Sequence, residues 1–476
     1  MKCVFQFWSC SPHLEASLEI AMTEALSGNQ VKYFWGGDDV LFSENNGQGK
    51  LGHNFKSQKP IFKAIRLLKR KIGDPIEFIT SWVNYGDVPE LPDNFQTLEG
   101  LFDFRHENFD VGRAAISSLS HLFLADLTKE DVRKLSPMLE EIIFSGIGVY
   151  NSALNLLKEC DADHVYVFNG RFIHEAAVHA AASKLGIKVS FHERGSTLDK
   201  FMLVDHLVHD VTALAKSAQE AWQKELEKSN DVVFLAKKYL DNRIYSATGP
   251  VQGSWKNLSQ SFDRKMSLEK MRQEIGICNE NYFVFFQSSD DEYAAVSKSI
   301  RVETEWQSQE DVVAFLAEMI DKKITLVVRL HPHMKDKNPC NLQSWMDLEK
   351  TLQDKGKNIK FVWQDSNVNS YLLASGATKV ICCGSTIGAE AIYLGKQTIC
   401  CGLADWSGLE GATEVLDYDS LGHALRNDCV IAPESILPIA YYRSTFGREY
   451  KYFKSTGIYS GDFLGVDLFN GQSYVC

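Results

Sequence analysis

The sequence predicts an α/β protein with two domains, each built on a parallel β-sheet. The chain has 476 residues, and a single hydrophobic core stops growing at about 250–300 residues, so more than one core is expected. Short apolar runs alternate with helical patterns, which is typical of parallel strands joined by crossover helices. Polar residues follow most of these runs, at the sheet edge where α/β proteins bind ligands.

The first half of the chain shows this alternation twice. An apolar run is followed by an amphipathic pattern that ends at Gly28, and a second apolar run comes next. The predicted elements are strands at 2–8 and 31–37 around a helix at 13–28, then strands at 164–170 and 187–195 around a helix at 174–185. The first domain is expected to cover residues 1–250.

The second half repeats the same order more clearly. Gly, Ser, Asn and Gln are frequent where the pattern weakens, which predicts a linker at 251–280. A second domain at 281–430 has strand candidates at 281–292, 324–333, 359–366, 378–388 and 397–403, with helices at 309–320, 343–353 and 389–394. The aromatic-rich segment 431–476 is expected to cross back over the first domain.

Composition excludes several classes of protein. The net charge of -12 argues against a nucleic-acid binder, because phosphate contacts need a concentrated basic surface. The eleven cysteines form no C-x-x-C pair and mostly lie in apolar runs, so reduced thiols in a cytoplasmic protein are expected. The N-terminus is a poor signal peptide, and no apolar run reaches the roughly 18–20 residues that span a bilayer.

The segment CCGSTIGAEAIYLGK has the clearest ligand pattern. A strand ends before Gly384, which permits a tight turn, and Ser385 or Thr386 precedes a helix whose free N–H groups attract an anion. Glu390 lies one turn into that helix, where a carboxylate could accept ribose hydroxyls. The alternative is an ordinary helix cap with a surface glutamate.

The segment RLHPH ends another strand with basic side chains. Pro332 lacks an N–H and stops the strand, so Arg329 and His331 are expected to reach a phosphate. His333 stays unassigned, and a purely structural loop is the alternative. Zinc is disfavoured because no third ligand stands at a known spacing, and no metal site is expected.

Polar clusters also end strands in the first domain. Glu193 follows His192 at a strand end and could act as a general base or a nucleophile, with His192 a weaker catalytic candidate. A structural pair of Glu193 with Arg194 is the alternative. Asn169 and Arg171 end the preceding strand. Ser288 and Ser289 end a strand of the second domain. Two sheets facing each other across a cleft would place all these clusters on its walls.

Taken in order, five motifs resemble the capsular polysaccharide biosynthesis glycosyltransferases of bacteria. The motifs are FNGR, HERG, FFQSSDDEYAAV, VVRLHPH and CGSTIGAEAIYLGK, and they span roughly residues 168–396. The family is related to Kdo transferases, bacterial sialyltransferases and CDP-glycerol glycerophosphotransferases. The resemblance implies a GT-B-like fold of two Rossmann-type domains, with the acceptor bound by the first and the nucleotide-sugar donor by the second.

The resemblance also implies roles for particular residues. His331 and Pro332 match a pair that contacts the donor nucleotide and its phosphate, and Ser385 and Thr386 match a phosphate-binding motif. The family's base lies in a stretch of two acids and a glycine, where this chain has His, Glu193, Arg and Gly and therefore a single acid. Asn169, Arg171 and Arg194 are assigned to the acceptor side. No cofactor is implied, since the nucleotide-sugar is a co-substrate.

The segment FKAIRLLKRKIGD indicates a further partner. Its basic residues alternate with apolar ones in a short amphipathic helix that could rest on an anionic membrane bearing a lipid-linked glycan acceptor. The basic residues are Lys63, Arg66, Lys69, Arg70 and Lys71. The localisation expected is cytoplasmic, with peripheral contact at the inner membrane. The solvated face of a core-packed helix is the alternative.

The leading hypothesis is a glycosyltransferase that moves a sugar from a CMP- or UDP-sugar to a capsule or O-antigen acceptor. A glycerophosphate or sugar-phosphate transferase would attack phosphorus instead. A non-catalytic nucleotide-sugar-binding assembly protein and an epimerase that needs no acceptor are further alternatives.

Overall fold

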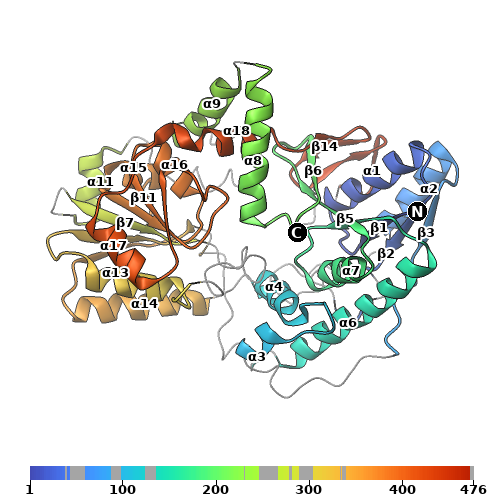
Figure 1. Cartoon of the computed structure of the whole chain (residues 1–476), viewed down its shortest axis with the longest axis horizontal. Helices are drawn as coiled ribbons and strands as arrows, with labels where there is room; N and C mark the ends of the chain where they lie inside the picture. The colour runs from blue at the N-terminus through green and yellow to red at the C-terminus, as the bar shows by residue number, and fades with distance from the viewer. Residues whose placement is uncertain are drawn as a thin grey trace. The chain divides into compact units, whose positions relative to one another are not determined.

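The computed structural model describes residues 1–37, 40–42, 59–86, 98–123, 134, 136–229, 231–245, 266–277, 281–288, 304–332, 334 and 339–471. The chain forms two compact units (Figure 1). Unit 1 comprises the described residues of Met1–His209 and of Phe446–Cys476, and unit 2 comprises those of Asp210–Tyr293 and Ser297–Thr445.

Unit 1 is built on a seven-stranded sheet in the order β13-β6-β5-β4-β1-β2-β3. The strands are β1 Lys2–Gln6, β2 Val31–Trp35, β3 Ile76–Ile79, β4 His164–Phe168, β5 Lys188–Arg194, β6 Lys200–Val204 and β13 Arg448–Glu449. The five from β5 to β3 run parallel, whereas β6 is antiparallel to β5 and β13 to β6. The carboxyl ends of β5, β4 and β1 therefore meet at one edge.

Helices cover both faces of this sheet. They are α1 His13–Leu26, α2 Lys59–Ile72, α3 Leu98–Asp103, α4 Val111–Phe123, α6 Ser136–Glu159 and α7 Ile173–Lys184. Alternate residues of β1 point to opposite faces: Phe5 joins the core under α4, α6 and α7, and Val4 joins the core under α1 and α2. Because both faces are buried, the strands read as continuous apolar runs.

The C-terminal segment packs against α1 in unit 1. Its small antiparallel sheet contains β14 Phe453–Gly457, β15 Ser460–Phe463 and β16 Val466–Asp467. The buried Glu19 carboxylate of α1 accepts the backbone N–H groups of Lys451, Tyr452 and Phe453 at 2.6, 2.9 and 3.2 Å. The returning segment begins at Phe446, since the residues before it belong to unit 2.

Unit 2 contains an all-parallel sheet in the order β12-β11-β10-β7-β8-β9. The strands are β7 Tyr282–Phe286, β8 Thr325–Arg329, β9 Ile359–Val362, β10 Lys379–Cys382, β11 Gln397–Cys401 and β12 Ala412–Val415. The sequence predicted the first five of these. The sixth, β12, was missed because ATEV has too few apolar residues for a strand signal.

Helices also cover both faces of the unit 2 sheet. One face carries α13 Gln309–Met319, α14 Pro339–Asp354 and α17 Tyr418–Arg426, and the other carries α8 Val211–Leu226, α9 Asp231–Tyr245, α11 Leu268–Glu274, α15 Ser370–Gly376, α16 Ile387–Tyr393 and α18 Leu437–Thr445. The α/β class and the two parallel-sheet units are thus confirmed. Their placement across a shared cleft stays a prediction.

The first unit ends at His209, not near residue 250 as expected. Helices α8 and α9 lie before the expected boundary but bury Trp222, Ala236 and Leu240 in a core of unit 2 together with Ile439 of α18. Amphipathic patterning reveals that a helix has a buried face but not which core receives it. The expected linker at 251–280 contains α11, whose Met271 is also in this core. Residues 251–265 and 278–280 lie outside the described part.

Two further findings concern the cysteines and the hydropathy of the helices. Cys10 is disulfide-bonded, which corrects the expectation of reduced thiols for this residue; seven other described cysteines are free. Among the described helices, none combines the length and the hydropathy that crossing a bilayer requires.

Candidate functional site

Glu193 is the centre of a polar cluster at the carboxyl edge of the unit 1 sheet. Its Oε2 accepts a hydrogen bond from Asn169 Nδ2 at 2.8 Å, and its Oε1 accepts from the Arg194 backbone N–H at 3.0 Å. His13 Nδ1 lies 3.5 Å from Oε1. Asn169 Nδ2 also lies 3.1 Å from His209 Nε2. The cluster joins the ends of β5 and β4, the start of α1 and the loop before unit 2.

Burial dominates the electrostatics of this cluster. It raises the pKa of Glu193, while the bonds from Arg194 N–H and Asn169 and the charges of Arg194 and Arg171 oppose that rise. The pKa of His13 lies well below its ordinary value, chiefly through burial and then through the charges of Arg194 and His192. His13 is therefore neutral near pH 7. The Glu193 side chain keeps 21% of its surface exposed, so a hydroxyl can approach it.

The turn after β4 aims Asn169 at the carboxylate. Asn169 and Gly170 both have positive φ, at 52° and 90°. A Cβ on Gly170 would meet Phe191 at 2.5 Å and Leu207 at 2.7 Å, so only glycine fits there. A non-glycine residue in this backbone region costs roughly 1–3 kcal/mol and is found often at functional sites. The strained backbone of Asn169 thus places its side chain where Nδ2 donates to the Glu193 carboxylate.

His192 is corrected from catalytic candidate to core residue. It is fully buried, and burial lowers its pKa to about 3. Its ring packs against Phe168 with centroids 5.7 Å apart, and within the described residues neither ring nitrogen has a hydrogen-bond partner. Successive side chains of a strand point to opposite faces of the sheet, so His192 and Glu193 lie on different faces, and only Glu193 joins the polar cluster.

The two arginines predicted for the acceptor side lie near the acid. Arg194 stacks on the Tyr459 ring of the C-terminal segment at 4.5 Å, and Arg171 stacks on Phe172 at 4.6 Å. Both charges favour the ionised form of Glu193. Unit 1 therefore brings together four of the predicted residues. Sequence reasoning missed His13 and His209, although His13 follows the first strand and so belongs to the same sheet edge.

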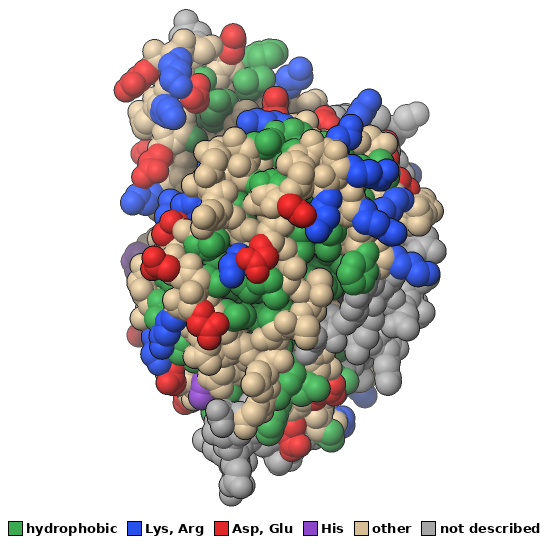
Figure 2. Space-filling view, turned by 90° about the vertical axis from the view of Figure 1, so that its right-hand side faces the viewer, with side chains coloured by type: hydrophobic (Ala, Val, Ile, Leu, Met, Phe, Trp, Pro, Cys, Tyr) green, Lys and Arg blue, Asp and Glu red, His purple; other side chains and the backbone are tan. Residues whose placement is uncertain are grey.

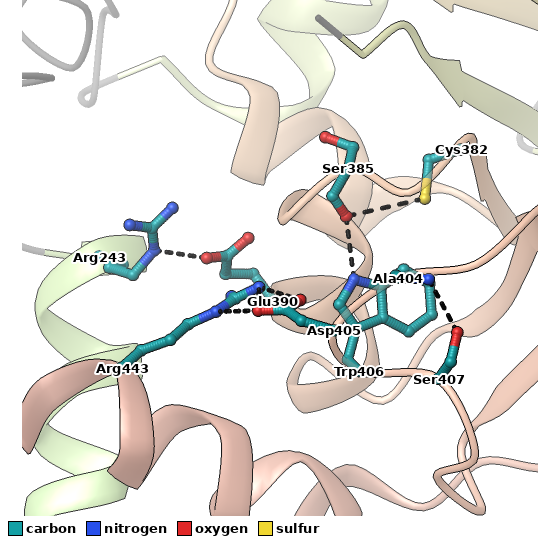
Figure 3. A network of polar contacts seen from close by, with 9 residues as sticks. All are labelled: Arg243, Cys382, Ser385, Glu390, Ala404, Asp405, Trp406, Ser407 and Arg443. Atoms are coloured by element: carbon teal, nitrogen blue, oxygen red, sulfur yellow. Dashed lines mark hydrogen bonds and ion pairs between the residues drawn. The ribbon is translucent and has the colours of Figure 1, made fainter. Parts of the chain in front are cut away.

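In unit 2 the turn Gly384 to Thr386 has the predicted geometry. Gly384 has φ of +72°, and a Cβ there would lie 3.0 Å from the Leu403 carbonyl oxygen. Thr386 is the exposed N-cap residue of α16, but its side chain makes no capping bond. The Ser385 carbonyl accepts the Trp406 indole N–H at 3.1 Å, while its hydroxyl points away from that contact (Figure 3). Neither hydroxyl is engaged by another described residue.

Ser288 braces the strand ends and is not open to a ligand. Its hydroxyl donates to the Cys383 carbonyl at 2.6 Å, and its backbone N–H donates to Gln309 Oε1 at 2.9 Å. The residue is buried. This fixes β7 beside the turn that begins at Gly384. Ser289 lies outside the described residues.

Arg329 is also a structural residue, contrary to the expected phosphate contact. Its guanidinium donates to the carbonyl oxygens of Val362, Trp363 and Ser366, with distances of 3.4 Å to the first and 3.3 Å to the last. The residue is only 1% exposed, and burial lowers its pKa to about 10. As the last residue of β8, it turns toward neighbouring β9 and holds the loop that follows it.

His331 remains a candidate after this correction. Its backbone N–H donates to Gln287 Oε1 at 2.9 Å, which fixes the chain as it leaves β8. His331 and Pro332 are both half-buried. His333 lies outside the described residues, so the segment offers one described imidazole at this strand end.

Glu390 is neither a surface residue nor open to a ribose. It is 1% exposed, and its Oε1 pairs with Arg243 Nε of α9 (Figure 3). Beside this pair, Arg443 of α18 holds Asp405 through contacts of 2.6 to 3.0 Å. Glu390 Oε2 is buried and has no hydrogen-bond partner in the described part of the chain. The carboxylate therefore fastens α9 to α16.

Across the described ranges, no group of three or more His, Cys, Asp or Glu side chains is placed to hold a metal ion.

Comparisons with known proteins agree with the resemblance. Residues 201–426 match the model of the family described as capsule polysaccharide biosynthesis protein, so the predicted resemblance to that family is confirmed over this part of the chain. No curated protein matches the chain.

Similar solved structures come from several kinds of protein. A beta Kdo 2,7 transferase, KpsC of Thermosulfurimonas dismutans, is 14% identical over 61% of this chain and 80% of its own, with a TM-score of 0.34. The UDP-GlcNAc 2-epimerase of Methanocaldococcus jannaschii is 14% identical over 80% and 94%, with a TM-score of 0.28. MurG of Acinetobacter baumannii is 12% identical over 93% and 94%, with a TM-score of 0.25. Likeness at these scores is too loose to place a ligand or a reaction in this chain.

Proposed function

We propose that the chain is a metal-independent glycosyltransferase that moves a sugar from a CMP- or UDP-sugar to a capsule or O-antigen glycan. The observation that carries the proposal is the Glu193 carboxylate, held by Asn169 and the Arg194 N–H with His13 beside it. A partly buried acid with a raised pKa at the carboxyl edge of a parallel sheet suits a general base. The family match over residues 201–426 supports the glycan context.

In this proposal Glu193 takes the proton from an acceptor hydroxyl. The hydroxyl oxygen forms a bond to the anomeric carbon of the donor sugar, and the bond from that carbon to the phosphate oxygen breaks. The nucleotide leaves with the electron pair. An ionised carboxylate has about four lone-pair sites, so Glu193 can accept the acceptor O–H while it keeps its existing contacts. Because His13 is neutral, it forms no tight ion pair with Glu193. The carboxylate therefore stays available to the proton of the acceptor hydroxyl.

The donor phosphate is assigned to the start of α16 in unit 2. The hydroxyls of Ser385 and Thr386 and the first N–H groups of the helix can donate to phosphate oxygens, and His331 can add a further donor. Together they would stabilise the charge that builds on the leaving group without a metal ion.

A product analysis tests the proposal. The protein is incubated with CMP- and UDP-sugars and with capsule or O-antigen oligosaccharides, and the products are identified by mass spectrometry and NMR. We expect a new glycoside and a free nucleotide. A phosphodiester product would instead identify a sugar-phosphate or glycerophosphate transferase, and an altered sugar without acceptor would identify an epimerase. If none of the donors is consumed, the enzyme proposal is wrong.

The proposal includes contact with an anionic membrane through α2. The apolar face of this helix is occupied, because Ile61, Ala64, Leu67 and Leu68 lie in the core. Its other face exposes four basic residues, Arg66, Lys69, Arg70 and Lys71, with Phe62 42% exposed among them. Figure 2 shows Lys and Arg side chains in the upper part of the side of the molecule on which α2 lies.

This contact would be electrostatic, worth about 1 kcal/mol per basic residue near the surface. Sedimentation with vesicles tests it. The protein should bind phosphatidylglycerol vesicles at low salt and not phosphatidylcholine vesicles. Binding that survives high salt, or that is unchanged in the variant R66E/R70E, would contradict the assignment.

A further inference from the structure

A pocket in unit 1 lies beside Trp82, away from the Glu193 cluster. It has a volume of about 180 Å³ and lies between α6 and the segment that follows β3. Its lining residues are Trp82, Asn84, Gly86, Asn151, Ser152, Asn155 and Leu156. Indole, carboxamide and hydroxyl groups dominate this lining, and none of the seven residues carries a charge.

The walls of the pocket are held in place by their own contacts. Ser152 is buried, and its hydroxyl accepts the Asn84 N–H at 2.8 Å, which ties the segment after β3 to α6. The Trp82 indole N–H donates to the carbonyl of Trp35, the last residue of β2, at 3.0 Å. Its ring packs edge-on against Phe5 and Phe34, with centroids 5.3 and 5.7 Å away. The pocket is therefore a built feature of the fold.

Polar groups remain for a ligand. Asn155 is exposed, and no described residue forms a hydrogen bond with its carboxamide. Asn84 uses Oδ1 to accept the Gly86 N–H at 2.9 Å, which directs its Nδ2 elsewhere. The Asn155 carboxamide presents both donors and an acceptor, and Asn84 Nδ2 adds donors, as a sugar ring with several hydroxyls requires. A phosphate or carboxylate ligand would call for a cation, and the lining has none.

We propose that this pocket binds an uncharged pyranose unit of the acceptor glycan, at a distance from the transfer site. The inference rests on the proposed glycosyltransferase function. The Trp82 wall of the pocket bonds to the last residue of β2, at the carboxyl edge of the sheet that also carries Glu193. Strand β3 is four places from β5, and neighbouring strands lie about 4.8 Å apart, which gives roughly 19 Å. That span corresponds to several sugar units.

The pocket therefore holds the body of a growing chain while its end is extended at Glu193. Long acceptors should bind better than short ones for this reason, since only a long chain reaches both places. An acceptor that ends within one or two units of Glu193 gains nothing from the pocket.

The variants N155A and N155W test this. N155A removes the free carboxamide, and N155W fills the pocket. The control E159A changes an exposed residue of the same helix that does not line the pocket. Acceptors are a disaccharide and a long chain of the same capsular repeat, each containing an uncharged unit.

For the long acceptor, N155A should raise KM roughly two- to tenfold, the loss of one or two hydrogen bonds, and N155W should raise it further. KM for the disaccharide and kcat for both acceptors should not change. An unchanged KM for the long acceptor in both variants, with active wild type, would overturn the inference.

Binding without a donor separates this inference from the proposed function. Calorimetry of the full chain with the long oligosaccharide should give heat that N155W abolishes and E159A preserves. That result supports the pocket even if no glycoside is formed. Absence of binding to the wild type would contradict the inference. Displacement of the oligosaccharide by free CMP or UMP would also contradict it, because the oligosaccharide would then occupy the nucleotide site.

Discussion

The strand ends of unit 1 and unit 2 carry similar polar residues but use them differently. In unit 1, Glu193 is contacted by other polar side chains and keeps an exposed fraction. In unit 2, Ser288, Arg329 and Glu390 all bond to the fold itself and are buried. What remains there for a ligand is a turn with the hydroxyls of residues such as Ser385. Polar residues at the ends of parallel strands thus divide into those that hold loops and those left for chemistry.

The largest expected effect is on catalysis by the unit 1 cluster. The variant E193Q keeps the size of the side chain but removes the base, so kcat should fall by about 10²- to 10⁴-fold. The control E77Q alters an exposed carboxylate of β3 and should leave kcat unchanged. Steady-state kinetics checks this, and nucleotide affinity in a thermal-shift assay should be equal in all three proteins. Unchanged transfer by E193Q would show that Glu193 is not the general base.

A slightly smaller effect is expected on stability in unit 2. The variant R329M removes the guanidinium that donates to the carbonyls of Val362, Trp363 and Ser366, which should lower the free energy of unfolding by about 1–3 kcal/mol. Denaturant unfolding measures it, with R426M at an exposed arginine as the control. Nucleotide affinity of folded R329M should match the wild type. A stable variant that has lost nucleotide binding would restore Arg329 to the donor site.

A pH effect on stability is expected from Glu15, a buried acid of α1 in unit 1. Burial raises the pKa of Glu15 to about 8, against the smaller opposing effects of its own backbone N–H and of the Ser11 side chain. A raised pKa means that the folded state binds a proton more tightly than the unfolded state. Stability from this group is therefore complete below about pH 4.5 and is lost as the pH rises toward 8.

The variant E15Q should remove that loss, with a gain of roughly 1–3 kcal/mol at pH 8 and little change at pH 4.5. Unfolding curves at several pH values measure the difference. A parallel pH dependence in wild type and E15Q would show that another group dominates.

The smallest effects compare two serines of unit 2. S385A should weaken nucleotide binding about tenfold without lowering the melting temperature, because its hydroxyl is free for a phosphate. S288A should lower stability by about 1 kcal/mol and leave nucleotide affinity unchanged, since its hydroxyl bonds to Cys383. Calorimetric titration with CMP and UDP, together with thermal unfolding, measures both. The opposite pattern would exchange their roles.

The sequence predicted the fold well where periodicity was strong. The strands at β1, β2, β4 and β5 and the helix α1 lie close to the predicted ranges, because both faces of the sheet are buried and their apolar runs are unbroken. The predicted boundary near residue 250 was wrong because the apolar residues of α8 and α9 do not indicate which of the two cores these helices pack against. The candidate residues around Glu193 were found because each follows a strand.

The sequence by itself determined the α/β class, most strands and the positions at which polar residues leave the sheets. Hydrophobic periodicity and turn residues are local, so they can be read along the chain. Only the tertiary structure decided which of those residues are free. In the folded chain His192 lies in the core, and Arg329 donates to three carbonyls. Glu390 pairs with Arg243, and His13 lies beside Glu193. These outcomes depend on partners far away in the sequence, and no local pattern contains them.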